Sequence, residues 1–253
     1  GLPLVAIPTT SGTGSEATHF AVVYIGTKKY SFAHEYVLPN YAIIDPTLSY
    51  SNPSYVKACS ALDAFSQAIE SLWAVGSSEE SRQYSRKAIK LIIDSIELAV
   101  IKNDIEAMNN MAIAANFAGK AINISKTTAA HAISYPITKY LNIPHGHAVA
   151  LTLGNFFVIN SKYFINQLND KRGVEYFEKI IEEINGFFEC SDSEMTCVKW
   201  YQLMDNLSLE NDLKSIFRKA SIEFSSISND INLERLNNNP VKISFNQIEE
   251  LFL

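Results

Sequence analysis

Apolar residues recur with the spacing of an α-helix through almost the whole chain after Pro53. Within residues 54–73, for example, Leu62, Phe65 and Ile69 fall on one face of a helix. Similar patterns predict helices at residues 79–101, 105–122, 128–140, 148–159, 174–188, 196–207, 211–224 and 245–252. A chain dominated by this pattern is expected to fold as a mainly α protein.

The first fifty residues have a different pattern. Short apolar runs, rich in β-branched and aromatic residues, predict strands at residues 4–7, 20–25 and 41–44. We therefore place a domain boundary near residue 50, with strand-rich residues 1–50 and helical residues 51–253. Because the chain opens directly in a core strand without an initiator methionine, we expect it to be a fragment of a longer protein.

Charge and composition limit the possible partners. The 253 residues are 47% hydrophobic and 19% charged, as in soluble globular proteins, and their net charge is -6. An acidic chain repels nucleic acid and anionic membranes, so we expect neither as a partner. The longest apolar runs, such as residues 151–160, are too short to span a bilayer. Cys59, Cys190 and Cys197 form no C-x-x-C motif and are expected to be reduced thiols in a cytoplasmic protein.

Polar side chains in apolar helical segments indicate a metal site. Asp63 lies in such a segment, and Gln67, four residues later, projects from the same helical face. Three histidines, His131, His145 and His147, fall within seventeen residues, and two histidines from other segments would complete a ligand set of mixed nitrogen and oxygen atoms, which suits Fe²⁺ or Zn²⁺. Taken alone, a buried histidine or aspartate can equally be a core residue that hydrogen-bonds the backbone.

The polar loop at residues 9–16 contains two glycines and follows a predicted strand. Backbone N–H groups and hydroxyls in such a loop can bind the phosphate or ribose oxygens of a nucleotide. A plain β-turn is the alternative, and the dinucleotide signature G-x-G-x-x-G is absent from this loop.

Five ordered motifs resemble the iron-containing (group III) alcohol dehydrogenases. These are IPTTSGTGSEAT at residues 7–18, IIDP at 43–46, LDA with AIE at 62–70, His131 fourteen residues before the His145 of a Pro-His-Gly motif, and NNP at 238–240. The resemblance implies the fold of dehydroquinate synthase, in which a Rossmann-like N-terminal domain binds NAD(P) and a helical domain holds the metal. Residues 1–50 would then be the remnant of a nucleotide-binding domain that is mostly missing, and the active site would lie between the two domains.

The resemblance also implies roles for individual residues. Asp63, His131 and His145 match three of the family's metal ligands, and Gln67 stands where the family usually has a fourth, histidine ligand. A further family histidine is replaced by Tyr135. The residues implied to position the cofactor are Thr9, Thr10, Ser11, Thr13 and Lys29. His147 is a candidate proton relay, and the alternative for it is a supporting or purely structural role.

Gln67, together with residues 131–136 and 144–147, most resembles a subgroup that includes phosphonoacetaldehyde reductases. We therefore predict an oxidoreductase that uses a divalent metal (Fe²⁺ or Zn²⁺) and NAD(P)H to reduce a small aldehyde, with phosphonoacetaldehyde as the candidate substrate and a homodimer as the candidate assembly. Two alternatives remain: a non-catalytic helical interaction domain without its cofactor half, and a dehydroquinate synthase-like lyase.

Overall fold

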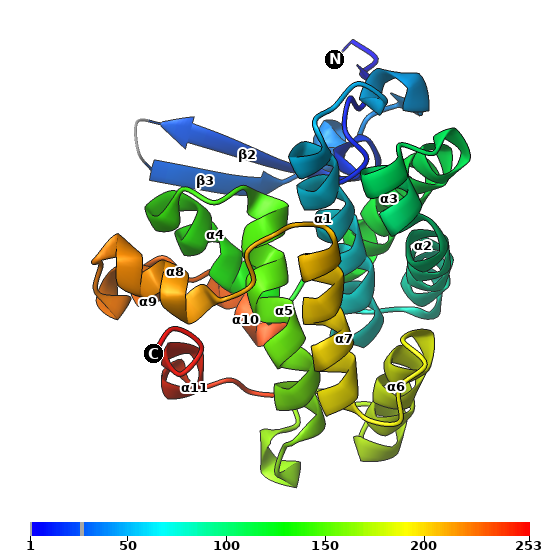
Figure 1. The fold of residues 1–253 in the computed structure, drawn as a ribbon. Coiled ribbons are helices and arrows are strands. Elements are labelled where there is room, and N and C mark those ends of the chain that lie inside the picture. Colours follow the sequence, from blue (N-terminus) through cyan, green and yellow to red (C-terminus); the bar gives the residue numbers. More distant parts are fainter. Residues whose placement is uncertain (1, 26–27) are drawn as a thin grey trace.

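The computed structural model describes residues 2–25 and 28–253, and it describes only the backbone for residues 24, 25 and 28–31. Helices dominate it (Figure 1). The longer helices are α1 (Ser54–Trp73), α2 (Glu79–Glu97), α3 (Ile105–Ser125), α4 (Ala129–Leu141), α5 (His145–Ser161), α6 (Val174–Phe187), α7 (Ser193–Asn206) and α8 (Leu213–Ala220). The chain ends with α9 (Phe224–Asn229), α10 (Leu233–Asn237) and α11 (Phe245–Glu249).

Helix α1 is the centre of the helical domain. It packs against α2 and α3 on one side and against α5 on the other, and α5 in turn contacts α4 and α7 (Figure 1). Every residue from 61 to 73 is buried, so α1 presents no face to solvent over this stretch. A helix buried on all sides must satisfy its own polar side chains, because an unpaired polar group in the interior is costly. The polar residues of α1 are therefore the first place to look for a site.

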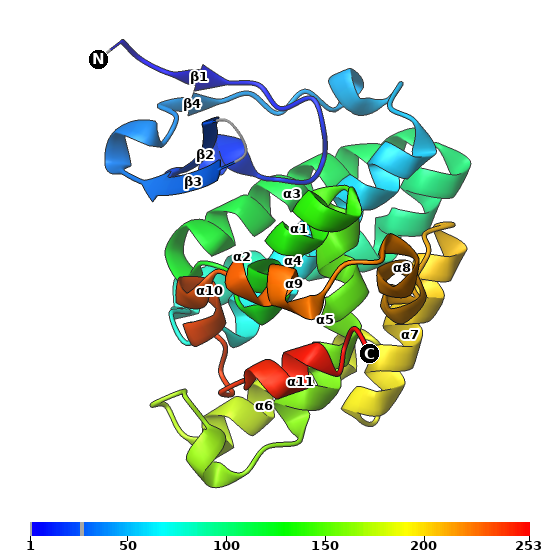
Figure 2. The same cartoon turned by 90° about the vertical axis from the view of Figure 1, so that its left-hand side faces the viewer.

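The N-terminal part lies above one end of the helical domain (Figure 2). Strand β1 (Val5–Ala6) pairs in parallel with β4 (Tyr41–Ala42), with Val5 opposite Tyr41. Strands β2 (Phe20–Ile25) and β3 (Lys28–Ala33) form an antiparallel hairpin. The described residues also form short 3₁₀ turns at Ser15–Ala17, Glu35–Val37, Pro46–Ser49 and Ile165–Gln167, and one turn of π-helix at Leu98–Lys102.

Two glycines fix the loop between β1 and β2 against the helices. A Cβ atom on Gly12 would lie 2.8 Å from Cβ of Ser60 in α1. Gly14 has a φ of 59° and approaches Gly119 of α3 so closely that an added Cβ would be 2.5 Å from its Cα. Only glycine fits both the left-handed conformation and this contact. The loop is thereby held over the middle of α1 and α3.

The predicted fold class is confirmed, with differences in detail. The predicted strand at residues 20–25 is present, whereas β3 was not predicted and the outer two runs form strands of only two residues each. The helix predicted at residues 211–224 is shorter, because Ser221 adopts a left-handed φ of 53° that ends α8. Helix α9, which begins at Phe224, was not predicted. Helix α10 was not predicted either, because its five residues are too few to show a helical pattern of apolar residues.

Helix α5 also begins earlier than predicted. It starts at His145, directly after Pro144, whose backbone has the extended conformation suited to the start of a helix. His145 and His147 therefore sit in the first turn of a rigid helix and not in a preceding loop. Among the described helices, none combines the length and the apolarity needed to cross a membrane.

Candidate metal centre

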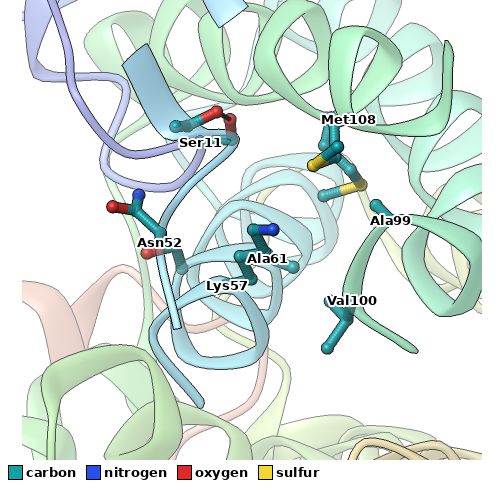
Figure 3. Close-up of a pocket in the computed structure, with 10 residues that line it drawn as sticks. Ser11, Asn52, Lys57, Ala61, Ala99, Val100 and Met108 are labelled. Atoms are coloured by element: carbon teal, nitrogen blue, oxygen red, sulfur yellow. Dashed lines mark hydrogen bonds between the residues drawn. The ribbon is translucent and has the colours of Figure 1, made fainter. Parts of the chain in front are cut away.

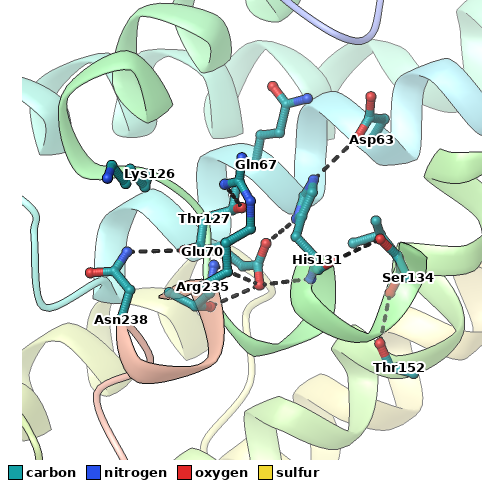
Figure 4. Close-up of polar contacts among 12 residues, drawn as sticks. Asp63, Gln67, Glu70, Lys126, Thr127, His131, Ser134, Thr152, Arg235 and Asn238 are labelled. Carbon is teal, nitrogen blue, oxygen red and sulfur yellow. Dashed lines mark hydrogen bonds and ion pairs between the residues drawn. The ribbon is translucent and has the colours of Figure 1, made fainter. Parts of the chain in front are cut away.

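Three side chains from three helices meet beside the middle of α1. Asp63 of α1, His131 of α4 and His145 of α5 each offer one ligand atom, and these atoms all lie within 4.8 Å of one another. Figure 4 shows Asp63 and His131 directed toward each other. Oδ1 of Asp63 is 3.4 Å from Nε2 of His131 and 3.9 Å from Nε2 of His145. Two ligand atoms about 2.1 Å from a tetrahedral cation are separated by about 3.4 Å. The distance between Asp63 and His131 therefore matches a shared coordination sphere, and the distance between Asp63 and His145 exceeds it by about 0.5 Å.

Glu70 fixes the ring of His131. Its Oε2 accepts a hydrogen bond from Nδ1 of His131, and its Oε1 accepts from the backbone N–H and the hydroxyl of Thr128, at 3.2 and 2.8 Å. Because Nδ1 carries the donated proton, the lone pair of neutral His131 resides on Nε2, which faces Asp63. A carboxylate behind a histidine in this way sets the tautomer and the orientation of a metal ligand.

Ser134 plays the same part for His145. Its hydroxyl donates to the carbonyl oxygen of His131 at 2.8 Å, so its oxygen is left to accept the Nδ1–H of His145 at 3.3 Å. The ring of Tyr135 stacks on the imidazole of His145, with centroids 5.5 Å apart and planes 6° from parallel. These contacts leave Nε2 of His145 directed at Asp63. The His145 side chain is 37% exposed, which gives solvent and small molecules access to the cluster.

Gln67 lies one helical turn after Asp63 and is buried. Its Nε2 donates to the carbonyl oxygen of Thr13 at 3.3 Å, and its Oε1 has no hydrogen-bond partner among the described residues. A buried carboxamide oxygen without a partner is costly, and coordination of a cation would remove that cost. One carboxylate, two imidazoles and this amide oxygen form a donor set that fits Fe²⁺ or Zn²⁺. The residues present therefore fit a divalent cation.

The acidic and basic groups of the cluster shift one another's pKa values toward their charged forms. Burial alone would raise the pKa of Asp63, but the hydrogen bond from His131 and the charge of His145 together lower it. Burial would likewise lower the pKa of His131, but the charge of Glu70 and the hydrogen bond to Asp63 raise it to about 9. The two carboxylates that flank His131 thus favour its protonated form when no cation is bound.

His147 lies elsewhere in the first turn of α5. Its Nε2 donates to the carbonyl oxygen of Glu210 at 2.6 Å, and its Nδ1 accepts from the hydroxyl of Tyr55 at 3.3 Å. Burial lowers its pKa, which favours the neutral ring. With both ring nitrogens hydrogen-bonded, His147 does not join the three-residue cluster, and its assignment as a proton relay remains a prediction.

The loop residues predicted to contact the cofactor lie close to α1, and each has different neighbours. The carbonyl of Thr13 is tied to Gln67, which places this part of the loop beside the metal cluster. Ser11 faces a small pocket that Asn52, Lys57 and Met108 also line, between the loop, α1 and α3 (Figure 3). The carbonyl oxygen of Thr9 accepts a hydrogen bond from Asn52 at 3.0 Å.

Thr10 lines a second small pocket, which also contains Glu16 and Asp45. The side chain of Lys29 lies outside the described part of the structure. For all five loop and strand residues, contact with a cofactor remains a prediction.

Sequence reasoning assigned no role to Glu70 or Ser134. Glu70 belongs to the AIE motif, and it follows Asp63 by seven residues and Gln67 by three, which places all three on one face of α1. That spacing was a usable signal. Ser134 carried none, because only the approach of α5 to α4 shows which acceptor His145 meets.

The fold places a cluster of candidate metal ligands among the helices that follow residue 53, and it places the strands in the first 42 residues. Residues 57–253 match the family described as "Fe-containing alcohol dehydrogenase family, C-terminal", and residues 1–46 match "Iron-containing alcohol dehydrogenase". The chain belongs to the iron-containing alcohol dehydrogenase family.

Similar proteins carry related names. The chain is 34% identical over 197 residues to long-chain-alcohol dehydrogenase 1 of Geobacillus thermodenitrificans, covering 75% of this chain and 49% of that protein. It is 32% identical to phosphonoacetaldehyde reductase of Streptomyces viridochromogenes, covering 72% and 47%. The crystal structure of sulfoacetaldehyde reductase from Bifidobacterium kashiwanohense in complex with NAD+ superimposes with a TM-score of 0.80 at 29% identity, covering 99% of this chain and 64% of that chain. The chain thus spans about half the length of the curated relatives and under two thirds of the solved structure.

Proposed function

We propose that this chain is the metal-binding part of an NAD(P)-linked alcohol dehydrogenase that reduces a small aldehyde, with Asp63, Gln67, His131 and His145 as the metal ligands. The observation that supports this most directly is the convergence of three ligand atoms within 4.8 Å. Membership of the iron-containing alcohol dehydrogenase family favours this reading over a dehydroquinate synthase-like lyase.

The residues of the site suit such chemistry. A divalent cation bound here would polarise the aldehyde carbonyl, and a bound reduced nicotinamide would supply the hydride. Glu70 and Ser134 hold the two imidazoles with their Nε2 atoms toward the cluster. The exposed edge of His145 is the side from which an aldehyde can approach. Thr13, tied to Gln67, belongs to the loop that we assign to the nicotinamide side of the cofactor.

Phosphonoacetaldehyde is the substrate we propose, with 2-hydroxyethylphosphonate as the product. The similarity to phosphonoacetaldehyde reductase and to sulfoacetaldehyde reductase supports an aldehyde with a terminal anion. We further propose that residues 1–50 belong to the nucleotide-binding domain and residues 51–253 form the metal-binding domain. A cytoplasmic location and a homodimeric assembly complete the proposal.

The His145→Ala variant tests the site. Removing one of the imidazoles that converge on Asp63 should abolish both metal retention after dialysis and oxidation of the reduced nicotinamide in the presence of aldehyde. His34→Ala is the matched control, because His34 is exposed and caps a short 3₁₀ turn. Undiminished metal content and activity in His145→Ala would refute the assignment. A wild-type enzyme that binds metal but reduces no aldehyde would favour the alternative of a non-catalytic helical domain.

A further inference from the structure

Arg235 is held in place by the segment that carries it. It lies in α10, which packs on α4. Three residues later, Asn238 accepts a hydrogen bond from the backbone of Gly76 at 2.9 Å and donates to the carbonyl oxygens of Ser125 and Thr127, at 2.8 and 2.9 Å. These bonds connect the C-terminal segment to the ends of α1 and α3. The backbone beneath Arg235 is therefore anchored.

The guanidinium of Arg235 is bracketed by aromatic rings. Its Cζ lies 5.9 Å from the ring centroid of Phe20 and 6.0 Å from that of Tyr135. Its Nη1 donates to the hydroxyl of Thr127 (Figure 4). The guanidinium also hydrogen-bonds the phenol of Tyr135. These contacts orient it and leave several of its five N–H donors for a ligand.

Arg235 has no ion-pair partner among the described carboxylates. The adjacent Glu234 pairs instead with Lys126. Arg82, Arg86 and Arg172 each form ion pairs with carboxylates. Arg235 is half-buried, so its charge is only partly screened by solvent. A cation of this kind is well suited to an anionic ligand.

Arg235 and the metal cluster share Tyr135 as a neighbour. The ring of Tyr135 stacks on His145 and also contacts Arg235. Burial raises the pKa of the Tyr135 phenol, the charge of Arg235 opposes that rise, and the charges of Asp63 and Glu70 add to it. The guanidinium is thus one aromatic ring away from the exposed ligand of the cluster.

The charge balance of the site makes this cation useful. The carboxylates of Asp63 and Glu70 would balance the two positive charges of a divalent cation, and the chain as a whole carries a net charge of -6. A negatively charged substrate would therefore be repelled overall and gain little from the centre itself. Among the described residues, Arg235 is a positive charge close to the cluster that can attract it.

We propose that Arg235, oriented by Thr127 and Tyr135, is the specificity-determining residue that binds the terminal oxyanion of the aldehyde substrate. The inference rests on the proposed function. Phosphonate and sulfonate share the chemistry that a guanidinium recognises through two parallel N–H···O bonds. The carbonyl end of such a substrate would then face His145 while its anionic end meets Arg235.

The test compares anionic and neutral aldehydes. In the complete metal-loaded enzyme, Arg235→Gln should lower kcat/KM for phosphonoacetaldehyde and sulfoacetaldehyde about 100-fold, and change it for propanal by less than about threefold. Arg235→Lys should recover part of the loss, because it keeps the charge but not the fork. A larger loss for the phosphonate than for the sulfonate would identify the dianion as the preferred ligand. Arg218→Gln, which removes an exposed arginine, is the control.

A binding measurement separates this inference from the proposed function. Calorimetry should show 2-hydroxyethylphosphonate binding to the wild type and to Arg218→Gln, and much weaker binding to Arg235→Gln. Equal losses of activity on anionic and neutral aldehydes, or unchanged binding in Arg235→Gln, would overturn the inference while leaving the reductase function in place. If the enzyme reduced no aldehyde but phosphonate binding still depended on Arg235, the anion site would stand and the proposed function would fail.

Discussion

Glu70 and His131 are joined by a buried hydrogen bond between Oε2 and Nδ1, and this contact decides which nitrogen of His131 faces Asp63. Glu70 is completely buried, and its other oxygen is bound to Thr128, so neither partner can turn without breaking further bonds. The orientation of the candidate ligand His131 therefore depends on Glu70, which is not itself one of the candidate metal ligands.

The Glu70→Gln variant tests that dependence. It removes the negative charge and weakens the acceptor of the His131 proton, so affinity for Zn²⁺ should fall by about 10- to 100-fold. Competition with a chelator measures the affinity. Glu234→Gln is the control, because Glu234 is an exposed carboxylate that pairs with Lys126. Equal affinities in wild type and Glu70→Gln would show that the orientation of His131 does not matter for binding.

The sequence was informative where periodicity and chemistry coincided. Helix α1 was predicted with its observed ends, and Asp63 stood out because a carboxylate in an otherwise apolar helix requires a partner. The start of α5 was misplaced, because the pattern around Pro144 reads equally as a loop or as a helix start. Ser134, Arg235 and the partners of His147 depend on how α4, α5 and the C-terminal segment pack, and no spacing along the chain encodes such contacts.

A substitution at Gln67 should increase the affinity of the candidate site for a divalent cation. Its Oε1 is buried without a hydrogen-bond partner among the described residues, and imidazole is a stronger ligand than a carboxamide for these ions. Gln67→His should therefore raise affinity for Zn²⁺ by about tenfold or more. Gln67→Leu, which supplies no ligand atom, should lower it. A Gln67→His variant with unaltered affinity would show that residue 67 does not reach the cation.

Metal affinity should depend on pH through His131. Its pKa is raised from 6.5 to about 9 in the metal-free protein, so a cation must displace a proton below that pH. Affinity for Zn²⁺ should accordingly rise about tenfold per pH unit between pH 7 and 8.5. An affinity that stays constant over this range would contradict the placement of a protonated His131 between two carboxylates.

The stability of the metal-free protein should change in the opposite direction. Because the folded pKa of His131 lies above the unfolded value, the stabilisation by its imidazolium is fully present below pH 6.5 and is lost as the pH rises through about 9. We expect the melting temperature to fall over this interval in the metal-free protein and to change less in the zinc-loaded protein. Differential scanning calorimetry at several pH values checks both.

A side chain at Gly146 should destabilise the protein, because α5 packs closely against α1 at this residue. A Cβ atom at this position would lie 2.0 Å from the carbonyl oxygen of Cys59 and 2.8 Å from Cβ of Asp63. The two helices would have to separate, so Gly146→Ala should lower the free energy of unfolding by about 2–3 kcal/mol and reduce metal retention as well. Gly186→Ala is a matched control in α6, where an added Cβ meets nothing within 4 Å.

The control variant Gly186→Ala should raise the free energy of unfolding by about 0.5–1 kcal/mol, because alanine loses less conformational entropy than glycine when a helix forms. Urea denaturation measures both changes, and chelator competition measures metal retention. If Gly146→Ala matched the control in stability and kept its metal, the close contact between His145 and Asp63 could not depend on the tight approach of α5 to α1.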